Sequence, residues 1–130
     1  MIVVDSSVVL EILLQTPASA TLTERLFSAG ETMHAPHLLD VEVVQVLRRY
    51  SALGSLDDRR GAQALSDLVD WPIRRYPHSF MLERIWALRA NLTAYDAAYV
   101  ALAELLDAPL LTRDGKIAGA PGHQAHIELI

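Results

Sequence analysis

The sequence predicts a single α/β domain over residues 1–130, with a short, mostly parallel β-sheet flanked by helices on both faces. Short β-branched apolar runs alternate along the chain with longer segments of helical periodicity. Hydrophobic residues make up 52% of the chain, which is enough for one core and too much for a disordered protein. No internal repeat or low-complexity linker divides the sequence.

The first half of the chain supplies two strands and three helices. Residues 2–4 are typical of a buried strand, and Asp5 caps a helix that runs to about residue 14. A second helix restarts at Pro17 and stops at Gly30. Residues 32–35 form a weak second strand, and Pro36 then opens a long helix to about residue 53.

The second half continues the same alternation. A helix over residues 56–69 leads to a strand over residues 72–77, whose flanking prolines place it away from the centre of the sheet. Residues 79–90 and 93–107 are predicted helices, and the run of small apolar residues in the latter indicates a buried helix. Two last strands follow at residues 110–112 and 127–130, and the Asp114-Gly115 dipeptide between them indicates a turn.

Composition excludes several classes of protein. The chain has no cysteine, which excludes a disulfide scaffold, a zinc–thiolate site and thiol catalysis. Its longest apolar stretches, residues 8–14 with Glu11 among them and residues 97–103, are far shorter than the roughly 18–20 residues of a membrane span. No secretory signal or nucleotide-binding loop is visible. We therefore expect a soluble cytoplasmic protein that makes no membrane contact.

Charge is distributed unevenly along the chain. The net charge of −5 is not typical of a nucleic-acid-binding protein, but residues 48–89 contain eight arginines and five acids, a local excess of +3. Arginine suits both phosphate and carboxylate partners. The candidates for RNA or partner contacts are Arg48, Arg49, Arg74 and Arg75, and solvated helix faces or structural ion pairs remain open for each of them.

Four carboxylates lie where the predicted topology brings them to one end of the sheet. Asp5 and Asp114 follow strands, Asp96 lies in the first turn of a helix, and Glu42 interrupts an apolar column of the long helix. Each has a structural explanation of its own, as a cap, a turn residue or a water-facing helix edge. A doubly wound sheet, however, collects ligand-binding groups at the carboxyl ends of its strands.

Clustered carboxylates repel one another and favour a bound cation. Two like charges about 4 Å apart cost roughly 4 kcal/mol at an effective dielectric constant of 20. Oxygen ligands without cysteine favour Mg²⁺, with Mn²⁺ as an alternative. Metal ions held by carboxylates commonly cleave phosphodiester bonds.

These residues resemble a known family. The matching segments are Asp5-Ser6-Ser7 after the first strand, Glu42 within residues 36–49, Asp96 within residues 92–104, and Leu111-Thr112-Arg113-Asp114. Together they resemble the PIN-domain nucleases, and more narrowly the VapC-type toxins of prokaryotic toxin–antitoxin pairs. The resemblance extends over essentially the whole chain, and the segment around Asp96 is its most specific part.

The resemblance implies a Mg²⁺-dependent endoribonuclease, usually a homodimer, that is silenced by a cognate VapB-type antitoxin and cleaves tRNA or rRNA. It implies that Asp5, Glu42, Asp96 and Asp114 are the catalytic and metal-holding acids. Ser6 and Thr112 would have supporting roles. Residues 115–117 lack the further acid that some relatives carry, so the choice between one and two metal ions stays open.

Other interpretations remain. The alternative function is a non-catalytic PIN-like interaction module that binds an arginine-rich protein through its acidic cluster. A dehalogenase-type protein would need a second Asp at position 7, where this chain has Ser. The tryptophans and tyrosines are expected in the core or at an interface rather than as base-stacking platforms. We expect the antitoxin near the two helices over residues 18–29 and 36–53.

Overall fold

The computed structural model describes all residues from Met1 to Ile130 and confirms the predicted fold class. Its sheet has five strands in the order β3-β2-β1-β4-β5, and every neighbouring pair is parallel. The sheet is therefore entirely parallel, where the sequence predicted it to be mostly so. The strands are β1 (Ile2–Val4), β2 (Met33–Pro36), β3 (Ile73–Tyr76), β4 (Leu110–Thr112) and β5 (Ile127–Leu129).

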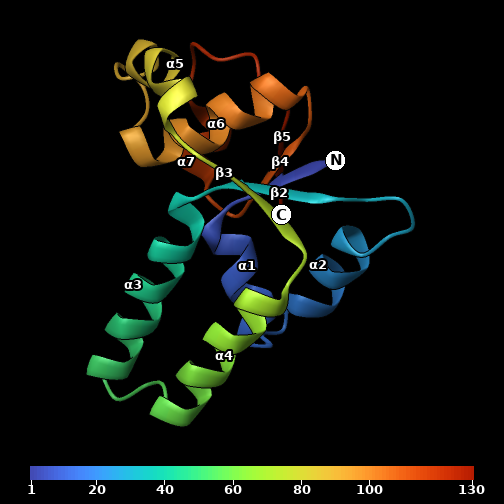
Figure 1. Ribbon diagram of the computed structural model, residues 1–130, viewed down its shortest axis with the longest axis vertical. Helices are drawn as coiled ribbons and strands as arrows, with labels where there is room; N and C mark the ends of the chain where they lie inside the picture. The colour runs from blue at the N-terminus through green and yellow to red at the C-terminus, as the bar shows by residue number, and fades with distance from the viewer.

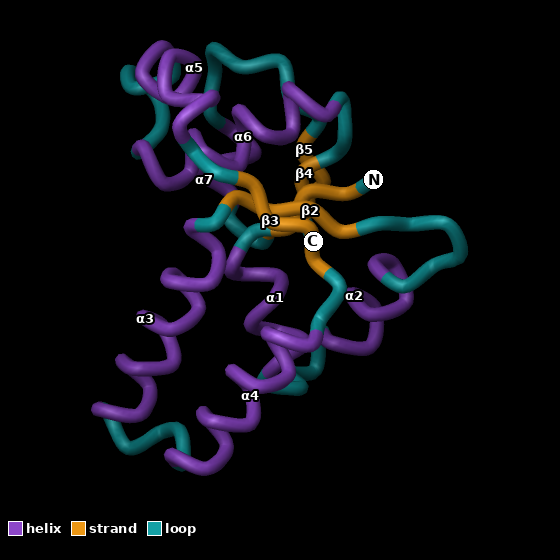
Figure 2. The backbone as a smooth tube through the Cα atoms, viewed as in Figure 1, coloured by secondary structure: helices purple, strands orange, loops and turns teal.

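Helices cover both faces of the sheet. Figure 1 shows α1 to α4 on one side and α5 and α6 on the other, while Figure 2 shows the strands between these two layers. The α3–α4 hairpin extends away from the sheet, so the connection between these helices lies far from the strands. The helices are α1 (Ser6–Leu13), α2 (Ser19–Leu26), α3 (Leu38–Ala52), α4 (Asp58–Asp70), the 3₁₀ turn η1 (Ser79–Met81), α5 (Leu82–Ala87), α6 (Ala94–Leu106) and α7 (Gly115–Gly119).

The core extends over both faces of the sheet, between the strands and helices α1 to α4 on one face and α6 on the other. All three residues of β1 are completely buried, as expected for a central strand covered on both faces. Every residue of α6 from Ala97 to Ala103 is also buried, which confirms the prediction of a buried helix. Four alanines in this run leave room for the close packing of α6 against β1 and β2. None of the helices is long and apolar enough to span a membrane.

Two predicted helix boundaries are wrong. Pro36 does not open a helix but ends β2, where it pairs with Tyr76 of β3 and needs no N–H of its own. The next residue, His37, donates its N–H to the Tyr76 carbonyl at 2.8 Å, and α3 begins only at Leu38. Helix α2 ends at Leu26 rather than near Gly30, which adopts a φ of 84° in the loop that follows.

The segment between β3 and β5 also differs from the prediction. The single helix expected over residues 79–90 is a 3₁₀ turn followed by the short helix α5. Its end is tightened, because the Leu88 N–H donates to the carbonyls of both Arg84 and Ile85. The Asp114-Gly115 turn is instead the start of helix α7, whose Lys116 N–H is capped by the Asp114 carboxylate at 2.8 Å.

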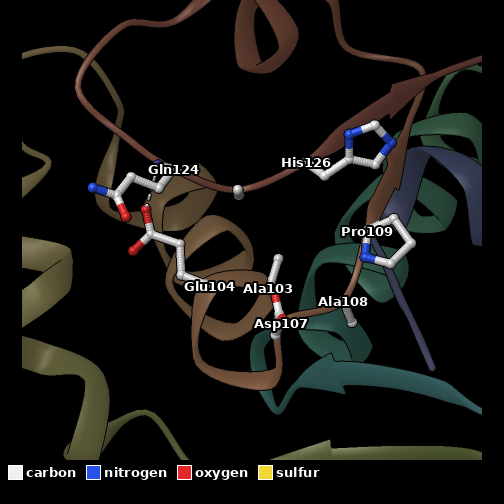
Figure 3. A pocket seen from close by; sticks show the side chains of 8 residues that line it. Ala103, Glu104, Asp107, Ala108, Pro109, Gln124 and His126 are labelled. Carbon is white, nitrogen blue, oxygen red and sulfur yellow. Dashed lines mark hydrogen bonds between the residues drawn. The ribbon is translucent and has the colours of Figure 1, made fainter.

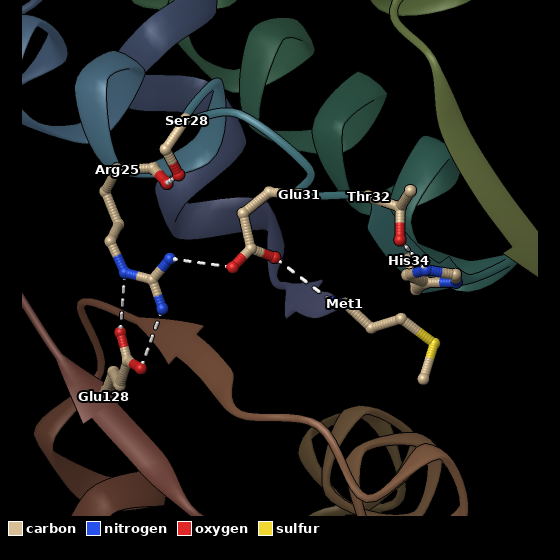
Figure 4. A network of polar contacts seen from close by, with 7 residues as sticks. All are labelled: Met1, Arg25, Ser28, Glu31, Thr32, His34 and Glu128. Carbon is tan, nitrogen blue, oxygen red and sulfur yellow. Dashed lines mark hydrogen bonds and ion pairs between the residues drawn. The ribbon is translucent and has the colours of Figure 1, made fainter.

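An ion-pair network ties the edge strand β5 to α2. Figure 4 shows the Arg25 guanidinium between the carboxylates of Glu128 and Glu31, and the Glu31 carboxylate also contacts the Met1 amino group. The Nε and Nη2 atoms of Arg25 lie 3.1 and 2.9 Å from the two carboxylate oxygens of Glu128. This forked contact stabilises the edge of the sheet that lies farthest from β3.

Candidate active site

The predicted acids gather where the direction of the strand order reverses. From β1 the chain proceeds to β2 and β3 on one side, whereas β4 pairs with the other side of β1. Asp5 follows β1 and Asp114 follows β4, so their backbones lie at neighbouring carboxyl ends of the sheet. Ligands of doubly wound sheets bind at this kind of switch point.

Asp5 is the most buried of the four acids, with 4% of its surface exposed. Its Oδ1 accepts hydrogen bonds from the Ser7 hydroxyl at 2.6 Å and the Val8 N–H at 3.2 Å, so it also caps α1. Its Oδ2 accepts a hydrogen bond from Thr112. Burial nevertheless raises the pKa of Asp5, because these donors offset only part of the cost of desolvating its charge.

Thr112 connects the first and fourth acids. Its hydroxyl donates to Asp5 and accepts the Asp114 N–H at 2.9 Å, and the side chain is completely buried. The neighbouring Arg113 N–H donates to the Ser7 hydroxyl at 3.0 Å. Two hydroxyl residues thus fix the ends of β1 and β4 relative to each other. The supporting position predicted for Thr112 is consistent with these contacts.

Glu42 projects from the second turn of α3 and is partly buried. It is neither a water-facing residue nor an unpaired acid, because the phenol of Tyr99 on α6 donates a hydrogen bond to its Oε1. Burial raises the pKa of Glu42, the Tyr99 hydrogen bond lowers it, and the charges of Asp96 and Asp5 raise it further. The Ser6 hydroxyl lies close enough to lower this pKa as well.

Asp96 lies in the first turn of α6, where the Thr93 hydroxyl caps the helix by accepting the Asp96 N–H at 3.2 Å. Its carboxyl group is partly buried and faces the other acids. Burial raises the pKa of Asp96, and the Asp114 carboxylate raises it further, while the Lys116 ammonium lowers it. The fold therefore brings the four acids into electrostatic contact, although they come from four separate elements.

The acids do not form a finished metal site in this conformation. No three Asp, Glu or His side chains converge closely enough to hold an ion. One oxygen of Asp5 and one of Glu42 are engaged by Thr112 and Tyr99. The donor set nevertheless fits a hard divalent cation, because it contains only oxygen and three of its four carboxyl groups have raised pKa values.

A hollow of about 340 Å³ opens beside Glu42 and contains none of the other three acids. Its walls come from α1, α3 and the first turn of α6. They are formed by Ser6, Leu38, Val41, Glu42, Gln45, Val46 and Tyr95. A second hollow, of about 250 Å³, lies at the opposite edge of the sheet, before β4 and β5, and contains none of the predicted residues (Figure 3). Its Glu104 is already engaged by Arg84 and the Gln124 N–H.

The four candidate arginines differ in their surroundings. Arg75 forms an ion pair with Asp40 at 2.8 Å and donates to the Leu68 and Ile73 carbonyls, so its guanidinium has a structural role. Arg74 lies over the Tyr76 ring and forms no ion pair. The exposed residues Arg48 and Arg49 lie on the half of α3 that points away from the sheet.

Sequence reasoning missed three groups near the acids. Tyr99 was assigned to the core, which is correct, but its phenol also holds Glu42. Ser7 rather than Ser6 carries the hydrogen bonds to Asp5 and to the end of β4. Arg113 pairs with Glu11 of α1 at 3.2 Å. Tyr99 lies three residues after Asp96 on the same helix, and this spacing was a signal that the two side chains share a face. No comparable spacing rule marks Ser7.

Comparison with known proteins yields one family. The model of the PIN domain matches residues 2–122. "Ribonuclease VapC12" of Mycobacterium tuberculosis is 42% identical over 130 residues, with 100% of this chain and 99% of the relative covered. "Ribonuclease VapC1" of the same organism is 43% identical over 129 residues, with 98% and 96% covered. The structure of VapBC2 from Rickettsia felis bound to a promoter DNA fragment superposes with a TM-score of 0.72 at 14% identity, covering 99% of this chain and 98% of that one.

Proposed function

This chain belongs to the PIN-domain family, and on that premise we propose that it is an endoribonuclease that serves as the toxin of a toxin–antitoxin pair. The observation that carries the proposal is the meeting of Asp5, Glu42, Asp96 and Asp114 at the switch point of the sheet. The full-length relatives named as ribonucleases support it. They disfavour the alternative of a non-catalytic interaction module.

We propose Mg²⁺ as the cofactor, with Mn²⁺ as a substitute. Asp5, Asp96 and Asp114 would hold the ion, and Glu42 would join them directly or through water. When bound, the ion supplies a water of lowered pKa and positive charge for the scissile phosphate. The raised pKa values of three of the acids support this assignment, because a cation would relieve the repulsion and desolvation that raise them.

The chain's own residues would orient the reacting groups. Thr112 and Ser7 hold the Asp5 carboxylate in one orientation, and Tyr99 does the same for Glu42. Glu42 has a raised pKa, which suits it to take up a proton from the attacking water. Attack on phosphorus with cleavage of the P–O3′ bond leaves 5′-phosphate and 3′-hydroxyl ends, the products that the family resemblance implies.

The decisive experiment is cleavage of total cellular RNA by the partner-free protein in Mg²⁺. We expect discrete fragments that disappear with EDTA and with Asp96→Asn. The matched control is Glu24→Gln, which removes one exposed carboxylate of α2 that forms no ion pair and should leave cleavage unchanged. Cleavage by the Asp96→Asn variant at the wild-type rate would contradict the assignment of the site. Fragment sequences would show whether the substrate is tRNA or rRNA.

An antitoxin partner requires a surface, and the two helices predicted to form it are not neighbours. Helices α2 and α3 do not share a groove, because α1 lies between them (Figure 1). A hollow of about 320 Å³ lies instead among α1, α2 and α4. It is lined by Phe27, which is 51% exposed and stacks on Trp71 at 5.7 Å, and by the acids Asp67 and Asp70.

We propose that the antitoxin docks in this hollow. The exposed Phe27 ring, stacked on Trp71, offers an apolar surface to a partner. Asp67 and Asp70 favour a partner segment that combines apolar and basic side chains. Phe27→Asp should prevent co-purification with the antitoxin and leave RNA cleavage intact. Sedimentation of the purified protein would test the proposed homodimer independently.

A further inference from the structure

Helix α5 presents an aromatic side chain that the fold does not use. Trp86 is 67% exposed, whereas Trp71, the only other tryptophan, is 8% exposed and packed in the core. An indole exposed to this degree offers a flat apolar surface on which a ligand can stack. Trp71 is thus a core residue as predicted, whereas Trp86 is not in the core, which leaves the predicted interface position open to it.

The positively charged side chain of Arg89 lies over one face of this indole. The Arg89 guanidinium carbon lies 4.3 Å from the centre of the Trp86 ring, and its Nη1 donates to the Trp86 carbonyl at 3.0 Å. This cation–π contact holds the guanidinium over the ring, and the residue as a whole is 67% exposed. No carboxylate lies within ion-pair distance of Arg89, so its charge is uncompensated.

The surrounding sequence favours an anionic ligand. Residues 71–95 contain four arginines and one glutamate, although the whole chain has a net charge of −5. Two of these arginines, Arg75 and Arg84, are neutralised by Asp40 and Glu104. The other two, Arg74 and Arg89, each lie over an aromatic ring and have no acidic partner. The unpaired charge of Arg89 beside the indole therefore favours an anionic ligand.

The helix that carries this indole directly precedes the helix that carries Asp96. Helix α5 ends at Ala87, and a short turn leads to α6, whose first turn carries Asp96. This turn is compact, because the Leu92 N–H donates to the Leu88 carbonyl at 3.2 Å. Helices α5 and α6 pack against each other, and Figure 1 shows α5 above the N-terminal part of α6. Helix α5 is thus packed against the helix that carries Asp96 and is joined to it by a short turn.

We propose that Trp86 and Arg89 bind single-stranded RNA beside the scissile phosphate, an inference that rests on the proposed ribonuclease function. One unpaired base stacks on the open face of Trp86, and the Arg89 guanidinium contacts an adjacent phosphate. Stacking on an aromatic ring requires an unpaired base but little sequence identity. The pair would therefore select single-stranded or splayed segments of the substrate rather than a particular base.

The test uses the full-length wild-type chain in EDTA, so that RNA is bound without being cleaved. Titration with a short oligoadenylate should quench the tryptophan emission, and the quenching should disappear in Trp86→Phe, which retains only Trp71. Trp86→Ala should weaken binding about ten-fold, the loss expected for one base–aromatic stack. Trp86→Phe should keep most of the affinity. Arg89→Gln should reduce the slope of log affinity against log salt concentration by about 1, the change expected for the loss of one phosphate contact.

Three comparisons make the test decisive. Leu82→Ala, which removes another exposed apolar side chain of α5, should bind RNA as the wild type does. An abasic strand of equal length should not quench Trp86. In Mg²⁺, Trp86→Ala should raise KM for RNA and leave kcat nearly unchanged.

Either of two results would overturn the inference. The first is wild-type RNA affinity and KM in Trp86→Ala while the wild type cleaves RNA normally. The second is a change in Trp86 emission per molecule that depends on protein concentration and not on added RNA. That result would assign this face to a second copy of the chain. Failure of the wild type itself to cleave RNA in Mg²⁺ would instead reject the proposed function.

Discussion

The phenol of Tyr99 on α6 donates a hydrogen bond to the carboxylate of Glu42 on α3, across the carboxyl edge of the sheet. Tyr99 is almost completely buried, so its orientation is set by the core rather than by solvent. Burial and the Glu42 charge raise the pKa of Tyr99 and keep the phenol protonated as a donor. The position of one acid of the site is thus fixed by a residue of the hydrophobic core.

Tyr99→Phe removes this donor without leaving a cavity. Because the hydrogen bond favours ionised Glu42, its loss should raise the pKa of Glu42 further. The acid limb of the pH–rate profile should therefore move to higher pH, and the free energy of unfolding should fall by about 0.5–1.5 kcal/mol. Tyr50→Phe, which removes a phenol of α3 that forms no hydrogen bond in the chain, is the control. An unchanged acid limb in Tyr99→Phe would show that Glu42 does not govern the rate.

The strand ends are what made the acids predictable. Asp5 comes directly after the apolar run of β1, and Asp114 comes two residues after the end of β4. Parallel topology then places both at the carboxyl edge of the sheet, whatever the details of packing. Asp96 was predictable because Thr93 marks the start of its helix. Glu42 was detected only as an acid in an apolar column, which indicated burial but not a partner.

Other features depend on contacts between distant segments. The Tyr99–Glu42 hydrogen bond joins residues 57 positions apart, and the Arg75–Asp40 pair joins residues 35 positions apart. Neither separation leaves a local pattern in the sequence. Helix α7 was read as a turn because Asp-Gly favours both a turn and a capped helix start. The exposure of Trp86 contradicts the usual preference of aromatic rings for burial.

Asp96→Asn should stabilise the protein in the absence of divalent ions. The pKa of Asp96 is raised on folding, so the folded chain binds a proton more tightly than the unfolded chain does. The free energy of unfolding therefore falls as the pH rises from the ordinary pKa of Asp to the raised pKa of folded Asp96. Ionised Asp96 thus destabilises the fold at neutral pH. At pH 7 in EDTA we expect Asp96→Asn to raise the melting temperature by about 2–5 °C. The difference should vanish below the ordinary pKa of Asp, 3.8.

With added Mg²⁺, the wild type should instead have a higher melting temperature than Asp96→Asn. Binding to the folded state alone raises the melting temperature of the wild type. The Asp96→Asn variant lacks one ligand and should respond little, and Glu24→Gln should respond as the wild type does. Equal Mg²⁺ responses in wild type and Asp96→Asn would place the ion elsewhere.

Glu128→Gln tests the network at the far edge of the sheet. It replaces a carboxylate that accepts two hydrogen bonds from Arg25, in a contact that solvent partly screens. We expect a loss of about 0.5–1 kcal/mol in the free energy of unfolding at low salt and a smaller loss at high salt. RNA cleavage should not change, because β5 carries none of the acids. A melting temperature equal to that of the wild type at low salt would show that this contact adds no stability.

Thr112→Val tests the link between the first and fourth acids. Valine keeps the shape of the side chain but leaves the buried Asp5 Oδ2 without its donor and the Asp114 N–H without its acceptor. Since Asp5 is almost fully buried, we expect a loss of about 1–3 kcal/mol in stability and a further rise in the pKa of Asp5. Cleavage should fall and require a higher Mg²⁺ concentration. Thr112→Ser keeps the hydroxyl and should retain most of the activity. Similar Mg²⁺ requirements for the valine and serine variants would contradict a role for this hydroxyl in orienting Asp5.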